Sequence, residues 1–474
     1  MEYELVCGLE THVELSTKTK LFCDCPTAFG GEPNTRCCPV CLGLPGSLPK
    51  LNREAVGFTV LAGLALGCTI SPRSHMDRKN YCYPDLPKAY QISQYDVPLC
   101  RDGRVTLSNG RVIRIARIHL EEDAGKLIHR QGETCIDYNR CGVPLIEVVT
   151  EPDFRSVEEA REYLELLRLT MRYLGISDCK MQEGSLRSDV NVSLRPKGTE
   201  DYGVRTEIKN MNSFTFMERA IRYEARRQEA ILRQGGSVSQ ETLRYLPEQD
   251  RTEPMRSKED AQDYRFFPEP DLCTVVVSPE WVEKLRGSLP ELPREKQARF
   301  QKEYGLPEED AKLLVQHRKI AEYFEETARE VEEPRNAARC ILEQVFRRLK
   351  TEEEKEQGQI PVPPEELSGL IRLLETKKIR RDLLRSTLET MLDTGKPWKE
   401  ILKPEDLEGI SPEKLRELCQ KAIENNAKAA QEYRDGKEKA LKALMGAVMR
   451  ECRGKADPAQ TEALLKELLR IAAT

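Results

Sequence analysis

Carboxylates stand inside apolar strand patterns in one stretch of the chain. Glu147 lies within the apolar run 145–149, whose β-branched residues predict a buried strand. A buried carboxylate is costly unless it is paired, hydrogen-bonded or bound to a metal, so a structural salt bridge is the alternative to a functional role. Glu121 and Glu122 end the preceding predicted strand. Because neighbouring strand residues face opposite ways, at most one of them shares a site with Glu147.

A second pair of candidate ligands lies near the amino terminus. The alternating pattern of residues 3–13 predicts a strand on which Glu10 and His12 point to the same face. A histidine beside a same-face carboxylate is a candidate ligand for a metal or a substrate. A solvated or core histidine is the alternative.

The cysteines are unevenly distributed, because thirteen of the 16 lie at or before Cys273. Cys23 and Cys25 form one short pair, and Cys38 and Cys41 form another after a loop of twelve residues. Two such pairs match a tetrahedral zinc site, with unrelated buried thiols as the alternative. We interpret this site as structural, since four cysteines leave no open position for chemistry. The adjacent Cys37 could replace Cys38.

Two further segments combine polar groups in patterns that suit ligand binding. Residues 77–96 place Lys79 and Lys88 among four tyrosines, which suits stacking on bases or holding phosphates; a packing loop is the alternative. Residues 181–210 resemble a hairpin in which the polar residues of each strand lie on one face. This face is either part of a binding site or a surface exposed to solvent. The polar residues of that hairpin are Asp189, Asn191, Glu207 and Lys209.

Composition places limits on the class of protein. A chain of 474 residues is too long for one hydrophobic core, and we expect two to four domains. Charged residues make up 33% of the chain, mean hydropathy is −0.59, and no run reaches the roughly 18 to 20 apolar residues of a membrane helix. The amino terminus lacks the pattern of a secretion signal, so we expect a cytoplasmic protein without a membrane partner. The net charge of −5 does not indicate a nucleic-acid binder, although a local basic face is compatible with it.

The pattern of the chain changes near residue 290. Before it, short alternating strand patterns and turns dominate, with helices expected at residues 157–174, capped by Ser156, and 216–234. After it, the composition and the 3.6-residue periodicity predict helices, among them one at residues 307–331, while residues 351–363 are interpreted as a linker. The fold class is therefore α+β, with a mixed or antiparallel sheet followed by an all-helical region.

Several common catalytic motifs are absent from the sequence. There is no phosphate-binding P-loop, no dinucleotide glycine fingerprint and no Gly-x-Ser-x-Gly elbow. A glycine loop of the amidase kind and a catalytic amino-terminal cysteine are also missing. A carboxylate cluster that holds Mg²⁺ and a nucleotide would therefore lie in an uncommon fold. If the reaction needs ammonia, this chain has no evident means to release it from glutamine.

Taken together, these segments resemble the GatB family, the B subunit of the tRNA-dependent Asp/Glu amidotransferase. The matching stretches are residues 8–14 (GLETHVE), the four paired cysteines, and residues 77–94, 119–126 (HLEEDAGK), 139–152, 184–187 (GSLR), 206–210 (TEIKN), 255–271 and 454–458. Thr11 stands where the family usually has an apolar residue, and residues 243–252 are atypical.

The resemblance implies a domain order and a reaction. Residues 1–293 would form a cradle domain for kinase and transamidase chemistry, with a zinc-knuckle-like cysteine cluster at 23–41. Residues 294–405 would form a helical domain, and residues 406–474 a YqeY-like helical tail that binds tRNA. ATP would phosphorylate the side-chain carboxylate of mischarged Glu-tRNA(Gln) or Asp-tRNA(Asn), and ammonia would then displace phosphate. Ammonia would come from an amidase-type A subunit, with a small C subunit completing a heterotrimer and no DNA involved.

The resemblance also assigns expected roles to residues. Mg²⁺ would be held by Glu10, His12, Glu122 and Glu147. Lys79 and Lys88 would face phosphates or the ammonia path, with Asp189 and Asn191 as weaker candidates for the same centre. ATP is expected near Glu10, His12, Lys79, Glu207 and Lys209. A non-catalytic, zinc-stabilised tRNA-binding scaffold remains the alternative function, and whether the product is Gln-tRNA, Asn-tRNA or both depends on the synthetases present.

Overall fold

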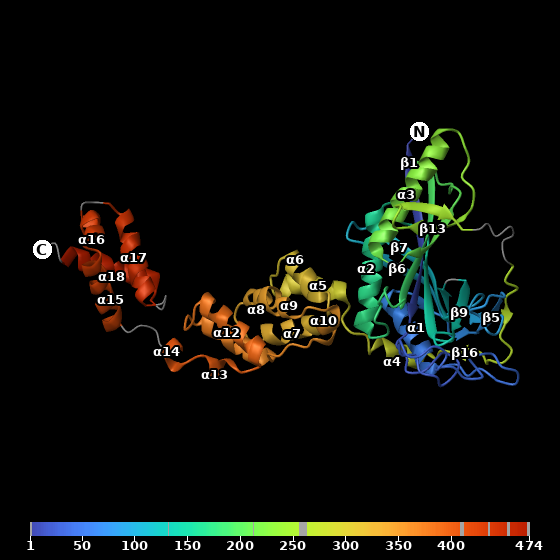
Figure 1. Ribbon diagram of the computed structural model, residues 1–474, viewed down its shortest axis with the longest axis horizontal. Helices are drawn as coiled ribbons and strands as arrows, with labels where there is room; N and C mark the ends of the chain where they lie inside the picture. The colour runs from blue at the N-terminus through green and yellow to red at the C-terminus, as the bar shows by residue number, and fades with distance from the viewer. Residues whose placement is uncertain are drawn as a thin grey trace. The chain divides into compact units, whose positions relative to one another are not determined.

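The computed structural model describes residues 2–130, 132–211, 213–255, 263–407, 412–434, 437–452 and 456–471. It divides into two compact units, Met1–Pro293 and Arg294–Thr474 (Figure 1). Residues 256–262 of the 255–271 motif and residues 454–455 of the tail motif lie outside the described residues.

The first unit is built on a large sheet. Its strands are β1 (Tyr3–Glu14), β2 (Thr69–Ile70), β6 (Cys100–Thr106), β7 (Val112–Glu122), β10 (Pro144–Thr150), β11 (Leu186–Pro196), β12 (Thr206–Met211), β13 (Thr242–Leu246) and β14 (Arg251–Pro254). They form nine strands in the order β14-β13-β12-β11-β1-β10-β7-β6-β2, and every pair except β12–β13 is antiparallel. The prediction of a mixed or antiparallel sheet is confirmed, and the sheet is mixed. The atypical segment 243–252 contributes to the hairpin β13–β14 at one edge.

Helices cover one face of this sheet. They are α1 (Arg53–Ala65), α2 (Val157–Leu174) and α3 (Phe214–Arg233), and Figure 1 shows α2 and α3 along one side of the strands. Ser156 caps α2 by accepting a hydrogen bond from the Glu159 backbone, and Gly175 ends the helix at a φ of 69°, where glycine is favoured. Alternate apolar residues of the strands pack against these helices in one core. The other alternate residues therefore face away from the helices.

Short strands add smaller sheets to the same unit. They are β3 (Arg73–Ser74), β4 (Asp77–Asn80), β5 (Tyr90–Ser93), β8 (Lys126–Arg130), β9 (Glu133–Asp137), β15 (Phe267–Pro268) and β16 (Val275–Val276), with helix α4 (Pro279–Arg286) near the end of the unit. The sheet β15-β4-β5 carries the tyrosine-rich segment. The Ser93 hydroxyl of β5 donates a hydrogen bond to Glu121 Oε2 of β7 at 3.0 Å, so this small sheet lies against the end of β7.

The second unit is helical, as the sequence predicts. Its elements are α5 (Pro293–Glu303), α6 (Glu308–Val315), α7 (Arg318–Ala328), α8 (Pro334–Cys340), the π-helical turn η1 (Ile341–Val345), α9 (Phe346–Arg348), α10 (Glu352–Gln357), α11 (Pro364–Glu375), α12 (Arg381–Thr394), α13 (Trp398–Ile401), α14 (Pro404–Leu407), α15 (Pro412–Asn425), α16 (Ala427–Arg434), α17 (Lys439–Glu451) and α18 (Pro458–Ile471). One apolar core runs from Phe300 to Leu402 and a second from Leu415 to Leu469. Among the described helices, none is long and apolar enough to cross a membrane.

Two local predictions in this unit are wrong. The single helix expected over residues 307–331 is two helices, because His317 takes an extended backbone (φ −131°, ψ 116°) between α6 and α7. The expected linker 351–363 contains α10, because Thr351 and Glu354 form a reciprocal capping box that satisfies free backbone N–H groups at its start.

Candidate active site

Strand register assembles one cluster of ionisable side chains from three strands. His12 of β1 lies opposite Glu147 of β10, which lies opposite His119 of β7. Glu121 follows two residues after His119 and therefore faces the same side, away from the helices. We call His12, His119, Glu121 and Glu147 the His–Glu centre.

Short contacts link the members of this centre. His119 Nε2 lies 3.1 Å from Glu147 Oε2 and 3.5 Å from Glu121 Oε2. His12 Nε2 lies 3.5 Å from Glu147 Oε2 and 3.8 Å from Glu121 Oε1. Each carboxylate therefore contacts both imidazoles.

The electrostatics of the centre follow from this pairing. Burial alone would lower the pKa of His119, but the Glu147 and Glu121 carboxylates outweigh burial and raise that pKa to about 9. Burial would raise the pKa of Glu147, yet His119 and His12 hold it well below its usual range. The two imidazoles thus compensate the two buried negative charges.

The donor atoms of this centre suit a divalent cation. His12, Glu121 and Glu147 each offer one ligand atom, and these atoms lie within 4.8 Å of one another. Mg²⁺ is usually bound through one or two protein carboxylates together with substrate phosphates, so two carboxylates in one cluster fit that ion. They also leave room in the coordination sphere for a substrate.

Two of the four predicted magnesium ligands, Glu122 and Glu10, lie outside this cluster of ligand atoms. Glu122, rather than Glu121, was expected beside His12 and Glu147, but Glu122 faces the other side of β7 because successive strand residues alternate. There it forms a buried ion pair with Lys88 and accepts a hydrogen bond from the Ile92 backbone at 2.9 Å. Glu10 also lies outside the group of three ligand atoms, although it shares the face of His12.

The remaining predicted polar residues gather beside Glu10 on the same face. Asn191 Nδ2 donates a hydrogen bond to Glu10 Oε1 at 2.8 Å. Lys209 Nζ lies 2.9 Å from Glu207 Oε1 and 3.8 Å from Asp189 Oδ2. Burial raises the pKa of Asp189 to about 6 even though His12 and Lys209 lie near. The structure thus brings five predicted residues next to the His–Glu centre: Glu10, Asp189, Asn191, Glu207 and Lys209.

The two lysines of the tyrosine-rich segment lie in different surroundings. Lys79 Nζ sits 4.8 Å from the Tyr264 ring centre and 5.8 Å from that of Tyr81. Burial raises the pKa of Tyr81, and the charges of Asp85 and Glu121 add to this effect, so Tyr81 lies within electrostatic reach of the centre. Lys79 therefore lies against two tyrosine rings, one of which is close enough to Glu121 for its pKa to respond to that charge.

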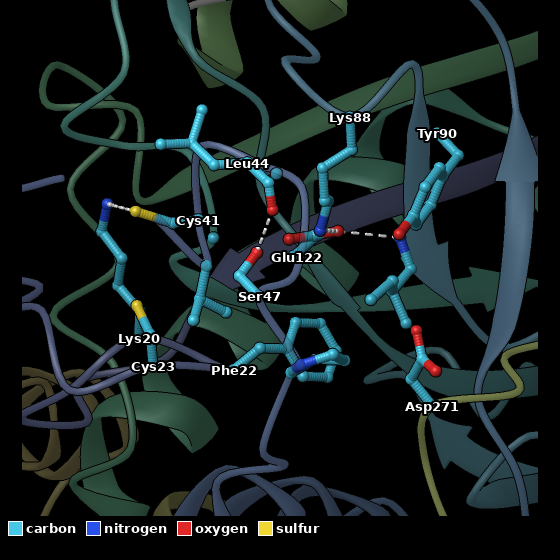
Figure 2. A pocket seen from close by; sticks show the side chains of 15 residues that line it. Lys20, Phe22, Cys23, Cys41, Leu44, Ser47, Lys88, Tyr90, Glu122 and Asp271 are labelled. Atoms are coloured by element: carbon cyan, nitrogen blue, oxygen red, sulfur yellow. Dashed lines mark hydrogen bonds and ion pairs between the residues drawn. The ribbon is translucent and has the colours of Figure 1, made fainter. Parts of the chain in front are cut away.

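Lys88 belongs to a different pocket. It lines a cavity of about 60 Å³ together with Glu122 and the zinc-candidate residues Cys23 and Cys41 (Figure 2). Its ammonium also lies 5.4 Å from the Tyr90 ring centre. Lys88 and Glu122 thus compensate each other's charge on the side of β7 opposite to Glu121.

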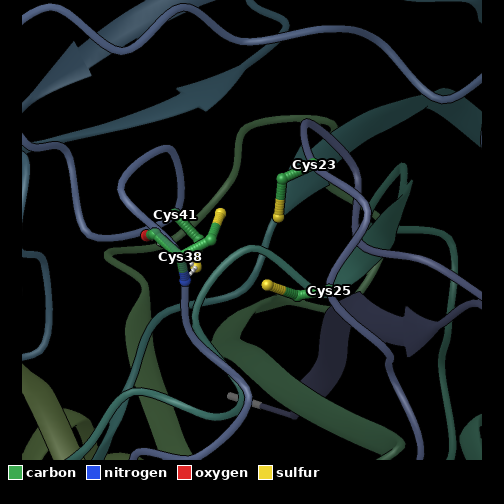
Figure 3. Close-up of side chains that lie close together, drawn as sticks. All are labelled: Cys23, Cys25, Cys38 and Cys41. Carbon is green, nitrogen blue, oxygen red and sulfur yellow. Dashed lines mark hydrogen bonds between the residues drawn. The ribbon is translucent and has the colours of Figure 1, made fainter.

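The four paired cysteines converge as their spacing predicts. The sulfur atoms of Cys23, Cys25, Cys38 and Cys41 lie within 4.8 Å of one another (Figure 3). Zinc bonded to sulfur at about 2.3 Å needs sulfurs about 3.8 Å apart, so modest adjustment would admit the ion. The Cys38 backbone N–H donates to Cys41 Sγ at 3.1 Å, which supports a thiolate there. The Cys37 thiol instead contacts Asn139 Oδ1 at 3.9 Å, which favours Cys38 as the ligand.

A buried lysine accompanies the cysteine cluster. Lys20 is only 1% exposed, and its ammonium donates to the carbonyl oxygens of Arg36 at 2.8 Å and Tyr138 at 3.4 Å and to Cys41 Sγ at 3.7 Å. Four thiolates around a dication carry a net charge of about −2, and Lys20 offsets part of it. The buried cation supports a metal-bound thiolate cluster in preference to four neutral thiols.

Sequence reasoning missed three residues that the structure brings to these sites. His119 could have been found, because it shares its face with Glu121 by simple strand alternation. Arg187, which donates to Asp123 at 2.6 Å, lies opposite His12 across β11 and β1, but only the strand register reveals this. Lys20 gave no signal, since nothing in the sequence around it distinguishes it from a surface lysine.

Comparison with known proteins identifies the family. Residues 5–283 match the GatB/GatE catalytic domain, and residues 322–469 match the GatB domain. The chain is 51% identical to the aspartyl/glutamyl-tRNA(Asn/Gln) amidotransferase B subunit of Thermoanaerobacter pseudethanolicus, over 99% of this chain and 100% of that protein. Identity is 50% to the protein of the same name from Caldicellulosiruptor saccharolyticus, over 99% of both chains, and 47% to that of Thermodesulfovibrio yellowstonii, over 99% of this chain and 100% of the relative. The chain therefore belongs to the GatB family, the B subunit of the tRNA-dependent Asp/Glu amidotransferase, a glutamine-dependent ligase.

Proposed function

We propose that the His–Glu centre is where this catalytic subunit uses ATP to activate the side-chain carboxylate of Glu-tRNA(Gln) or Asp-tRNA(Asn). The observation that carries the proposal is the convergence of His12, Glu121 and Glu147 within 4.8 Å on the helix-free side of the sheet. A bound Mg²⁺ would neutralise the charge of ATP phosphates there.

The chemistry has two balanced steps. A carboxylate oxygen of the aminoacyl group attacks the γ-phosphorus of ATP, so that the bond to the bridging oxygen breaks and ADP leaves. Ammonia then attacks the carbonyl carbon of the acyl phosphate, inorganic phosphate leaves, and a proton is lost from nitrogen. A carboxylate is a poor acceptor for ammonia, whereas an acyl phosphate has a good leaving group.

Side chains around the centre would orient both reactants. Glu121 and Glu147 would supply the charge that holds the cation, and His119 orients both carboxylates through its contacts with them. Lys209 and Lys79 would contact phosphates of ATP, and the Asn191 hydrogen bond would hold Glu10 in place beside His12.

Ammonia and the remaining parts of the reaction require partners. The relatives are named as the B subunit of an amidotransferase, which indicates a multisubunit enzyme. We infer an amidase-type A subunit that releases ammonia from glutamine, a small C subunit, and a tRNA-binding role for residues 406–474. Zinc held by the four cysteines would be structural, because the four thiolates fill its coordination sphere.

The test is Glu147→Gln in the assembled complex with Mg²⁺, ATP, glutamine and mischarged tRNA. We expect amidation and tRNA-dependent phosphate release to fall by about 10²-fold or more, since a charge at the metal is lost. Glutamine hydrolysis by the partner should survive. Glu133→Gln, an exposed change on β9, is the matched control and should remain fully active.

Normal amidation by Glu147→Gln would contradict the assignment of the site. If wild-type complex binds mischarged tRNA but releases no phosphate from ATP, the chain is instead a tRNA-binding scaffold.

A further inference from the structure

Arginines lie directly opposite each other on two neighbouring strands of the large sheet. Arg101 of β6 pairs with Arg117 of β7, and Arg104 pairs with Arg114. Directly opposed residues point to the same face, and like charges in this position destabilise a sheet. We call these four residues the arginine edge.

Only one of the four arginines has its charge compensated. Arg114 binds Asp153 through Nη2 at 2.7 Å from Oδ1. Within the ranges that the structure describes, no ion pair or side-chain hydrogen bond is found for Arg101, Arg104 or Arg117. Charges on an edge strand also discourage sheet aggregation, but β7 is an interior strand, so this reason does not apply to Arg117.

The arginine edge shares its face with the His–Glu centre. The side-chain alternation of β7 is regular from Arg117 to Glu121, so Arg117 and His119 point to the same side about 7 Å apart along the strand. One row of paired residues crosses five strands from β11 to β6 and lies two residues along the strands from the row of His12, Glu147 and His119. Its members, in order, are Asp189, Glu10, Val149, Arg117 and Arg101. The face is therefore acidic toward β11 and basic toward β6.

We propose that the arginine edge binds backbone phosphates of the terminal nucleotides of tRNA and so holds the aminoacyl end over the His–Glu centre. The inference rests on the proposed function. Arg101 and Arg104 share this face although they are three residues apart, because Asp102 between them has a φ of 56° and interrupts the alternation of β6. Cys100 and Val105 of the same strand lie in the core on the other face. The patch therefore covers both rows of paired arginines. A patch of that extent suits the repeated phosphates of a nucleic-acid strand, whereas the phosphates of ATP are needed at the metal.

The test measures the salt dependence of mischarged-tRNA binding by the assembled complex. Arg101→Gln, Arg104→Gln and Arg117→Gln are made singly and together. Each lost phosphate contact should reduce the slope of log affinity against log salt by about 0.7 to 0.9, and the triple variant should bind on the order of tenfold more weakly at physiological salt. KM for ATP should not change.

Matched variants separate charge from structure. The triple lysine variant keeps the charges and should keep most of the salt slope. Arg226→Gln removes an exposed arginine from α3, on the helix-covered side of the sheet, and should leave the slope unchanged.

Three outcomes would overturn the inference: an unchanged slope in the triple variant, a raised KM for ATP with normal tRNA binding, or loss of complex assembly. The first excludes phosphate contacts, the second assigns the arginines to ATP, and the third assigns them to a protein interface of the complex. Each is distinct from failure of the proposed function, in which the wild-type complex itself does not release phosphate.

Discussion

The His–Glu centre and the cysteine cluster are built on opposite principles although they lie in the same unit. The centre draws its ligands from β1, β7 and β10, which are far apart in the chain, and its two carboxylates leave coordination positions open. The cysteine cluster draws four sulfurs from one loop, and these would fill the coordination sphere of a zinc ion; the buried Lys20 ammonium donates to one of them, Cys41 Sγ. The cysteine cluster therefore follows from local sequence spacing, whereas the His–Glu centre depends on strand register.

The largest expected effect concerns the cysteine cluster. Cys38→Ser should abolish stoichiometric zinc binding and lower the thermal midpoint of the first unit, because structural zinc contributes on the order of 10 kcal/mol or more to folding. Metal analysis by mass spectrometry and a thermal melt would measure both. Cys37→Ser is the matched control, and equal zinc loss in that variant would show that Cys37 is the ligand.

The same comparison explains how far the sequence could predict the sites. The spacing of Cys23, Cys25, Cys38 and Cys41 predicted that these cysteines converge, because both pairs lie in one loop, and left only Cys37 as an alternative to Cys38. The sequence also restricted the centre to one of Glu121 and Glu122, but it could not choose between them. That choice depends on the pairing of β7 with β10, which no local pattern encodes.

The fold was predictable to a similar depth. Alternation and periodicity predicted a sheet-based first unit and a helical second unit, and Ser156 marked the start of α2. The break at His317 escaped prediction because the residues on both sides of it are good helix formers. The order of the nine strands could not be derived, since long-range pairing leaves no signal in one sequence.

A smaller effect, on zinc affinity, is expected from substitution of Lys20, whose ammonium donates to Cys41 Sγ. Lys20→Met should weaken zinc affinity by about 10- to 100-fold, since it removes the positive charge and the hydrogen bond beside Cys41. Competition with a chromophoric chelator would measure the affinity. Lys18→Met removes an exposed lysine two residues away and should leave it unchanged. Equal affinities in the wild type and Lys20→Met would show that the cluster does not need this charge.

The smallest effect, on KM for ATP, is expected from substitution of Asn191, which lies beside the His–Glu centre. Asn191→Ala removes the hydrogen bond to Glu10 and should raise KM for ATP by about threefold to tenfold while zinc content stays constant. Steady-state kinetics with Asn191→Asp as a second variant would distinguish loss of the amide donor from loss of volume. A normal KM in both variants would remove Glu10 from the nucleotide site.

The central claim is that Glu121, and not Glu122, belongs to the metal site. Titration of the full-length chain with Mn²⁺, followed by electron paramagnetic resonance, tests it directly, because Mn²⁺ accepts the same oxygen ligands as Mg²⁺. Glu121→Gln should lose the bound Mn²⁺, whereas Glu122→Gln, and Glu122→Gln combined with Lys88→Met to avoid an unpaired buried lysine, should retain it with normal zinc content. Retention of Mn²⁺ by Glu121→Gln together with its loss in both Glu122 variants would contradict the account.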